Sequence, residues 1–125
     1  MFRRSETGAL EEVGQFPTGG LGNGGGLGSQ GAITLTDDKQ FLLAVSAGSN
    51  ELSLLEIQND GLALVDIVST GGDRPISVTT RGDRVYVVNA ADAGSVRGFS
   101  LDEDSLVPIA GANANLSSTV DATGA

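Results

Sequence analysis

The sequence predicts an all-β protein, a β-propeller segment of about two four-stranded blades plus the last strand of a preceding blade. Three observations predict this fold. Short apolar runs of strand length alternate with clusters of turn-forming residues. The pattern recurs about every 43 residues, as between Ile33 and Ile76, and this spacing matches the ~40–45 residues of a propeller blade. Glycine contributes 19 of 125 residues and aromatic residues only 4%, which suits many tight turns better than a helical bundle.

The clearest element is the stretch 41–57, FLLAVSAGSNELSLLEI, which predicts two strands joined by a polar turn. Its first five residues form an unbroken apolar run, as expected of a strand covered on both faces. The stretch 85–101, VYVVNAADAGSVRGFSL, repeats the same order of apolar run, turn and second strand. The two stretches therefore predict matching parts of two blades.

Residues 1–20 are predicted to be the terminal strand of a preceding blade. They place Leu10 and Val13 ahead of Thr18-Gly19-Gly20, the order that recurs between Leu62 and the Thr-Gly-Gly at 70–72. We therefore expect the chain to be a piece of a longer propeller, or else a unit that self-associates to close a ring. The predicted segments are a terminal strand (1–20), a Gly-rich inter-blade loop (21–30), two blades (31–72 and 73–111) and a linker toward a missing blade (112–125).

The Gly-rich stretch contains matches to G-x-G-x-x-G, for example at 20–25. A dinucleotide site requires a helix after the glycines, so that the pyrophosphate meets the helix N-terminus. The strand pattern at 32–36 follows instead, and there is no Gly-Lys-Ser/Thr. We therefore predict a flexible loop and no cofactor.

Composition excludes several classes of function. The chain has no cysteine and no histidine, so Ser-His-Asp catalysis, Cys-His catalysis and zinc sites with these ligands are excluded within it. The acidic run 102–104 lacks the spacing of an EF-hand, and no metal is predicted. A net charge of −9 repels phosphate backbones, so we expect no nucleic-acid partner. No apolar run is long enough to span a membrane and no signal peptide is visible, so localisation stays open, with the cytoplasm as the default.

Three segments resemble the lactonase family of seven-bladed β-propellers, which includes 6-phosphogluconolactonase-like and carboxymuconate-cyclase-like proteins. They are residues 28–32 (GSQGA), 41–50 (FLLAVSAGSN) and 74–78 (RPISV). The resemblance covers most of this chain but only part of a family-length propeller. It implies a hydrolase or lactonising cyclase acting on the lactone of a sugar acid or a muconate-type anion. The alternative is a non-catalytic propeller scaffold that binds a small molecule or a protein, and the sequence leaves the choice open.

Two departures from the family pattern bear on activity. The usual Ser-Pro-Asp-Gly-Arg turn between the first two strands of a blade is Thr-Asp-Asp-Lys-Gln at 36–40, without proline or glycine. Members with demonstrated chemistry commonly place a histidine at the start of an innermost strand, where this chain has Ala32 and Ile76. The catalytic residues are therefore not assigned.

Ligands of propellers gather at the mouth of the central channel, beside the loops that lead into the innermost strands. Arg74 is the strongest candidate there, because a fixed cation binds a substrate carboxylate or phosphate, or stabilises a lactone oxyanion. The alternative for Arg74 is an ion pair with Asp73 or Asp66. Gln30 is a second candidate, as a donor to the same small-molecule anion. Further along, Tyr86 is predicted to be a core residue, and the side chain of Asn89 is predicted to satisfy backbone groups in its own turn.

Overall fold

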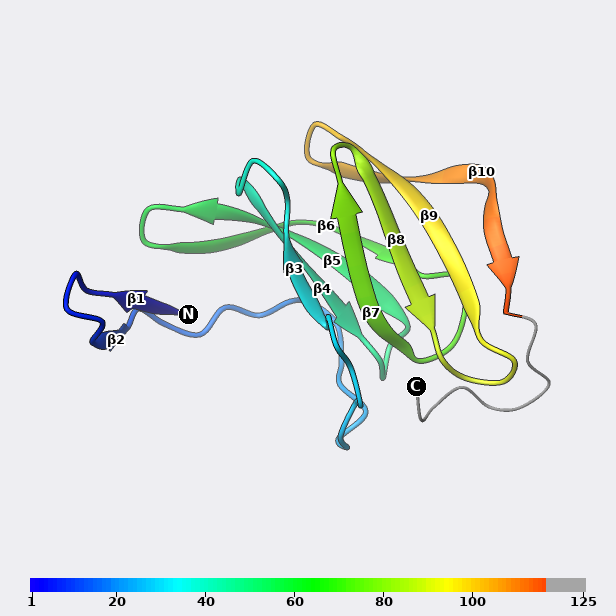
Figure 1. Ribbon diagram of the computed structural model, residues 1–125, viewed down its shortest axis with the longest axis horizontal. Coiled ribbons are helices and arrows are strands. Elements are labelled where there is room, and N and C mark those ends of the chain that lie inside the picture. The colour runs from blue at the N-terminus through cyan, green and yellow to red at the C-terminus, as the bar shows by residue number, and fades with distance from the viewer. Residues whose placement is uncertain (117–125) are drawn as a thin grey trace.

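The computed structural model describes residues 1–116, and this part of the chain contains strands and no helix. Its strands, labelled in Figure 1, are β1 (Phe2–Arg4), β2 (Leu10–Glu12), β3 (Ile33–Leu35), β4 (Phe41–Ser46), β5 (Glu51–Gln58), β6 (Gly61–Ser69), β7 (Pro75–Arg81), β8 (Arg84–Asn89), β9 (Ser95–Asp102) and β10 (Ser105–Asn115). They form one two-stranded hairpin and two four-stranded antiparallel sheets. The predicted all-β architecture with two four-stranded blades is confirmed.

The first blade, β3 to β6, is a meander in which each strand pairs with the next one along the chain. The apolar run at 41–46 forms β4, which pairs with β3 on one side and with β5 on the other. Successive side chains of a strand point to opposite faces of the sheet. The paired residues Leu43 and Leu54 therefore lie on one face, and the paired residues Leu35 and Leu42 lie on the other.

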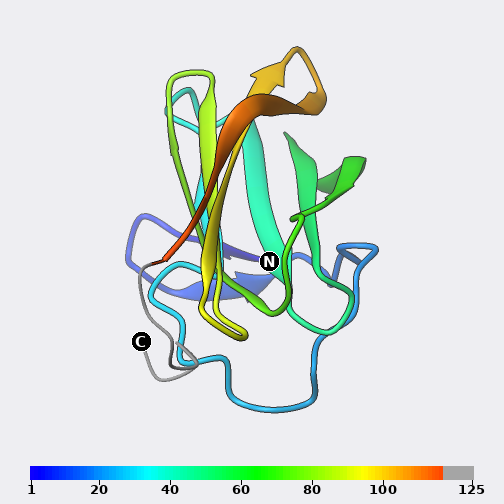
Figure 2. The ribbon, with the colours of Figure 1, turned by 90° about the vertical axis from the view of Figure 1, so that its right-hand side faces the viewer.

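The second blade, β7 to β10, repeats this order and packs against the first, so that the two sheets lie side by side (Figure 1 and Figure 2). The layer between the blades is the hydrophobic core, formed by Leu43, Leu52, Leu54, Val78, Val85, Val87, Phe99 and Leu106. Burying one such side chain contributes about 1.5–3 kcal/mol. The contact between the blades is therefore the main apolar source of stability in the described residues.

Two carboxylates of the first blade bind backbone N–H groups of the second. Asp37 accepts a hydrogen bond from the Gly82 N–H at 2.7 Å. Asp66 accepts one from the Leu106 N–H at 2.7 Å and a second from the Ile67 N–H at 2.8 Å. The bonds from the Gly82 and Leu106 N–H groups cross between the blades and so fix them relative to each other, whereas the bond from Ile67 lies within the first blade.

The N-terminal segment differs from the prediction of a single terminal strand for residues 1–20. It forms the hairpin of β1 and β2, and β2 ends at Glu12. Every residue of both strands is exposed, and among residues 1–116 β2 pairs with β1 alone. Beyond the hairpin, the ring of Phe16 lies against Gly61, where a Cβ atom would lie 2.5 Å from the nearest ring carbon.

The boundary predicted at residue 111 is also wrong, because β10 continues to Asn115. Its pairing with β9 shifts register between Pro108 and Asn113 and then resumes along Arg97 to Ser95. Proline has no N–H to donate to the ladder, and such an irregularity accommodates it. The rest of the predicted linker, 117–125, lies outside the described residues.

The faces of the two blades that point away from the core both expose large apolar or aromatic side chains. The outer face of the first blade is apolar, with Ile33 63% and Leu35 46% exposed. The outer face of the second blade carries Tyr86, which is 42% exposed and packs beside Gly98. Tyr86 is therefore not a core residue of this part of the chain, contrary to the prediction.

Residues 1–116 supply no apolar helix of the length that crossing a membrane requires.

Candidate functional site

Three connections lie together at one end of the sheets, the lower end in Figure 1. They are the β6–β7 connection (70–74), the β4–β5 turn (47–50) and the β8–β9 turn (90–94). From here on, "the inter-blade loop" means the β6–β7 connection (70–74) and not the Gly-rich stretch at 21–30. It leaves the outermost strand of one blade and leads into the innermost strand of the next. Arg74 is its last residue.

Asn50, at the end of the β4–β5 turn, holds the inter-blade loop through both its backbone and its side chain. Its carbonyl accepts hydrogen bonds from the Thr70 N–H at 3.0 Å and from the Thr70 hydroxyl at 3.1 Å. Its amide nitrogen donates to the Asp73 carboxylate at 2.6 Å, and its amide oxygen accepts from the Arg74 N–H at 2.8 Å. The first blade thus binds both ends of the loop that leads into the second.

Arg74 stands in the left-handed backbone region with φ of 56°, directly before Pro75. Its carbonyl accepts the Ala90 N–H at 2.9 Å, which anchors the loop to the second blade. Its Nε is buried and has no hydrogen-bond partner. Among residues 1–116 the one ion pair joins Arg84 to Asp83, so the alternative of an ion pair between Arg74 and Asp73 or Asp66 is not realised.

Gln30 does not lie at the same point of the mouth as Arg74. Its side chain is exposed, and its neighbour Gly31 accepts a hydrogen bond from the Val78 N–H at 2.8 Å. This places Gln30 beside the middle of β7, about 13 Å along the strand from Arg74 at ~3.3 Å per residue. A single small group therefore does not span the two candidates, and a ligand that contacts both must be extended.

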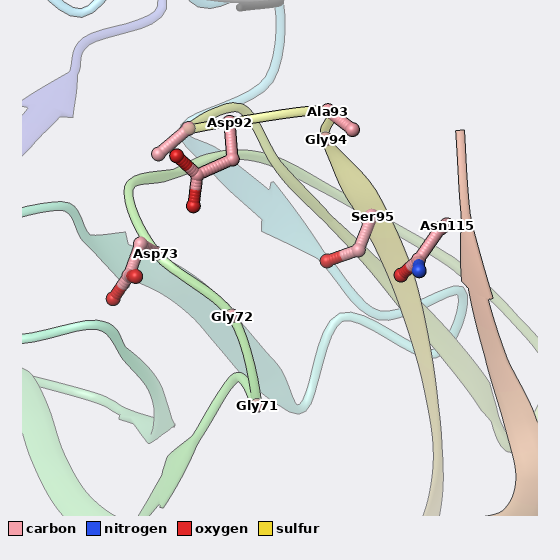
Figure 3. A pocket seen from close by; sticks show the side chains of 9 residues that line it. Gly71, Gly72, Asp73, Asp92, Ala93, Gly94, Ser95 and Asn115 are labelled. Carbon is pink, nitrogen blue, oxygen red and sulfur yellow. The ribbon is translucent and has the colours of Figure 1, made fainter. Parts of the chain in front are cut away.

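A cleft of about 300 Å³ opens between the inter-blade loop and the β8–β9 turn (Figure 3). The carboxylates of Asp73 and Asp92 lie toward one side of the view, and the polar ends of Ser95 and Asn115 lie toward the other. The wall between them includes backbone of Gly71 and Gly72. Sequence reasoning did not place Asp92, Ser95 or Asn115 at this cleft, because strand and turn propensities do not show that the end of β10 meets the β8–β9 turn.

A buried polar group lies close to this cleft. Asn89 and Thr70 are almost wholly inaccessible to solvent. The Asn89 amide nitrogen donates to the Thr70 carbonyl at 3.3 Å and approaches the Ser95 hydroxyl at 3.2 Å, and its amide oxygen has no partner. Asn89 therefore binds the inter-blade loop, not only its own turn as predicted. Gly72 is required here, since a Cβ atom would lie 2.6 Å from the Asn89 amide nitrogen.

Arg97 is a second arginine near the inter-blade loop, and sequence reasoning missed it. It lies within β9, and its Nε is buried without a partner. Its guanidinium packs against the inter-blade loop, with Nη1 3.3 Å from the position of a Cβ built on Gly71. A lone arginine inside an ordinary strand pattern gives no sequence signal for such a placement.

The described residues hold no group of three or more carboxylate, histidine or cysteine side chains that could bind a metal ion. A shifted pKa occurs at the opposite end of the sheets, in the β3–β4 turn. There the Thr36 hydroxyl, at 2.6 Å, and the Gln40 N–H, at 3.0 Å, lower the pKa of the exposed Asp38 below its ordinary value of 3.8. This shift reflects the geometry of a turn, because Asp38 lies far from the inter-blade loop.

Comparison with solved structures supports the propeller fold. A protein of unknown function from Desulfotomaculum acetoxidans is 23% identical with a TM-score of 0.75, over 98% of this chain and 37% of that protein. A putative 6-phosphogluconolactonase from Bacteroides uniformis is 19% identical with a TM-score of 0.73, over 98% of this chain and 38% of that protein. The chain thus spans less than two fifths of the length of either protein. None of the curated proteins matches it.

The family comparison agrees with the repeat structure. The family model described as "Lactonase, 7-bladed beta-propeller" matches residues 1–116, which include the hairpin and both blades. The match covers the whole described part of the chain, and the fold has the four-stranded antiparallel blades that such a propeller requires. The chain therefore belongs to the lactonase family of seven-bladed β-propellers.

Proposed function

We propose that this chain is part of a propeller that acts on the lactone of an anionic substrate, a sugar acid or a muconate-type acid, and that Arg74 binds the anion. The observation that carries the proposal is the state of the Arg74 side chain. Its guanidinium has no ion-pair partner in the described residues, its Nε is buried and unpartnered, and it leads into the innermost strand of the second blade. Membership of the lactonase family and the likeness to a putative 6-phosphogluconolactonase support the substrate class.

The chemistry requires one cation near the substrate. In lactone hydrolysis, water adds to the ring carbonyl, negative charge develops on the carbonyl oxygen, and the ring C–O bond then breaks to release a carboxylate and a hydroxyl group. A guanidinium contributes by a bidentate contact with a substrate carboxylate or phosphate, or by stabilising the developing oxyanion. Gln30 is proposed as a donor to a more distant part of an extended ligand. We assign no general base to this chain.

The test is hydrolysis measured by acid release at constant pH, with 6-phosphogluconolactone and the uncharged gluconolactone as substrates. We expect Arg74→Ala to lower kcat/KM for the phosphorylated lactone by roughly tenfold to a hundredfold relative to the uncharged one, as expected when a charge-assisted contact is lost. Arg74→Lys should retain part of the preference. The control is Arg84→Ala, because Arg84 is exposed, pairs with Asp83 at 3.6 Å and begins β8 at the end of that strand away from the inter-blade loop. Equal losses for both lactones would exclude Arg74 as the anion-binding residue.

The second candidate is a non-catalytic scaffold that binds a small molecule or a protein. Two observations favour it. The chain contains no histidine, and the titratable groups that line the cleft are the two carboxylates Asp73 and Asp92. Binding of 6-phosphogluconate that depends on Arg74, without turnover of either lactone, would support this candidate over the enzyme.

A further inference from the structure

Asn50 occupies a backbone position for which the second blade uses glycine. The φ angle is 60° at Asn50 and 74° at Gly94. The two residues are equivalent because each carbonyl accepts an N–H from the chain that leaves the outermost strand, Thr70 to Asn50 at 3.0 Å and Leu116 to Gly94 at 3.0 Å. Glycine adopts this conformation without steric cost. The backbone alone therefore does not require asparagine at position 50.

The Asn50 side chain makes contacts that Gly94 cannot make. Its amide nitrogen donates to the Asp73 carboxylate at 2.6 Å, and its amide oxygen accepts the Arg74 N–H at 2.8 Å. Both ends of one amide are thus used on two consecutive residues of the inter-blade loop. The Asn50 side chain therefore links the β4–β5 turn to the inter-blade loop.

The contact with Asp73 bears directly on Arg74. Asp73 is the carboxylate next to Arg74 in sequence, and an ion pair between them would neutralise the guanidinium. That pair is not formed, and the Asp73 carboxylate instead accepts a hydrogen bond from Asn50. We propose that Asn50 is a positioning residue, which holds Asp73 away from Arg74 and so keeps the guanidinium available for a carboxylate or phosphate. This inference rests on the proposed role of Arg74 as the anion-binding residue.

The test is titration of the 125-residue chain with inorganic phosphate at low ionic strength, followed by NMR shifts of the Arg74 amide and Nε–H. Asn50→Gly keeps the left-handed turn and removes the amide, so Asp73 becomes free to pair with Arg74. We expect it to weaken phosphate binding by roughly threefold to tenfold, the scale of one competing charge contact. The double variant Asn50→Gly with Asp73→Asn should restore affinity to within about twofold of the parent, because the competing carboxylate is gone.

Lys39→Gly is the matched control, since Lys39 has φ of 59° in the β3–β4 turn at the other end of the sheets. It should leave phosphate binding unchanged. Undiminished binding by Asn50→Gly would overturn the inference while leaving Arg74 as the anion-binding residue. Weakened binding that the double variant does not restore would also overturn it, because Asn50 would then act only by ordering the loop. No binding by the parent, or equal binding by Arg74→Ala, would remove the proposed role of Arg74 and this inference with it.

Discussion

The two blades have the same strand order but differ at the turn positions where the backbone has positive φ. The second blade uses glycine at two of them, Gly82 and Gly94, and the first blade uses Lys39 and Asn50 at the equivalent places. A side chain in this region costs roughly 1–2 kcal/mol. Asn50 offsets that cost with two hydrogen bonds to the next blade, whereas no hydrogen bond of the Lys39 side chain occurs among the described residues. The difference separates a position whose side chain binds the inter-blade loop from one that merely tolerates strain.

The two Thr-Gly-Gly segments give a second comparison. In both, the last glycine packs on the end of the second strand of the following blade: Gly20 against Ser46, and Gly72 against Asn89. The loops diverge only after this contact, since Arg74 follows Gly72 within two residues whereas the chain after Gly20 first passes through the Gly-rich stretch. The contact with the strand end therefore restricts side-chain size, and the segment beyond it is free to vary in length.

Among substitutions that test the comparison of the two Thr-Gly-Gly segments, the largest effect on the free energy of unfolding is expected at Gly72. In Gly72→Ala, the new Cβ would lie 2.6 Å from the Asn89 amide nitrogen and 2.8 Å from the Ser95 hydroxyl. Asn89 is buried and cannot move away freely, so we expect a loss of about 1–3 kcal/mol in the free energy of unfolding, as for other overpacked sites. The measurement is urea denaturation followed by circular dichroism.

Gly26→Ala is the matched control, because nothing lies within 4 Å of a Cβ at Gly26. It should change the unfolding free energy by less than about 0.5 kcal/mol, as surface substitutions usually do. If the two variants were equally stable, the contact at the strand end would not be what restricts the Thr-Gly-Gly segment.

Much of the architecture could be predicted from the sequence, because apolar runs and turn clusters act locally. The run at 41–45 and the spacing between equivalent positions placed both blades, and the Thr-Gly-Gly repeat related residues 1–20 to the end of the first blade. The site was predicted less completely. Arg74 and Gln30 stay predictions, and the placement of Asn50, Asp92 and Arg97 around the inter-blade loop was not anticipated. Their positions depend on which turns of different blades meet, and strand periodicity does not contain this information.

A smaller effect on the free energy of unfolding is expected from exchanging Lys39 of the β3–β4 turn and Gly82 of the β7–β8 turn, at the end of the sheets away from the inter-blade loop. Lys39→Gly should raise the unfolding free energy by about 0.5–1 kcal/mol, because glycine removes the left-handed strain and only part of the gain is lost to the flexibility of the unfolded chain. Gly82→Lys should lower it by about 1 kcal/mol for the same reason. Denaturation curves of the two variants, measured together, check both directions. A destabilised Lys39→Gly would mean that the lysine side chain contributes a contact that outweighs the strain.

The smallest effect concerns pH and distinguishes the same two turns, because the β3–β4 turn contains Asp38 and its hydrogen-bond donors. The Thr36 hydroxyl and the Gln40 N–H lower the pKa of Asp38 below 3.8 in the folded chain. A lowered folded pKa means that the carboxylate stabilises the turn above the unfolded pKa, and that this contribution is lost as pH falls through the folded pKa.

An NMR titration of the Asp38 carboxyl carbon should therefore have its midpoint below 3.8. Thr36→Val should move that midpoint upward, and its stability deficit relative to the parent should narrow between about pH 5 and about pH 2. A midpoint at or above the ordinary value in the parent would show that the turn does not hold Asp38 as described, and the strain at Lys39 would then have no compensating hydrogen bonds nearby.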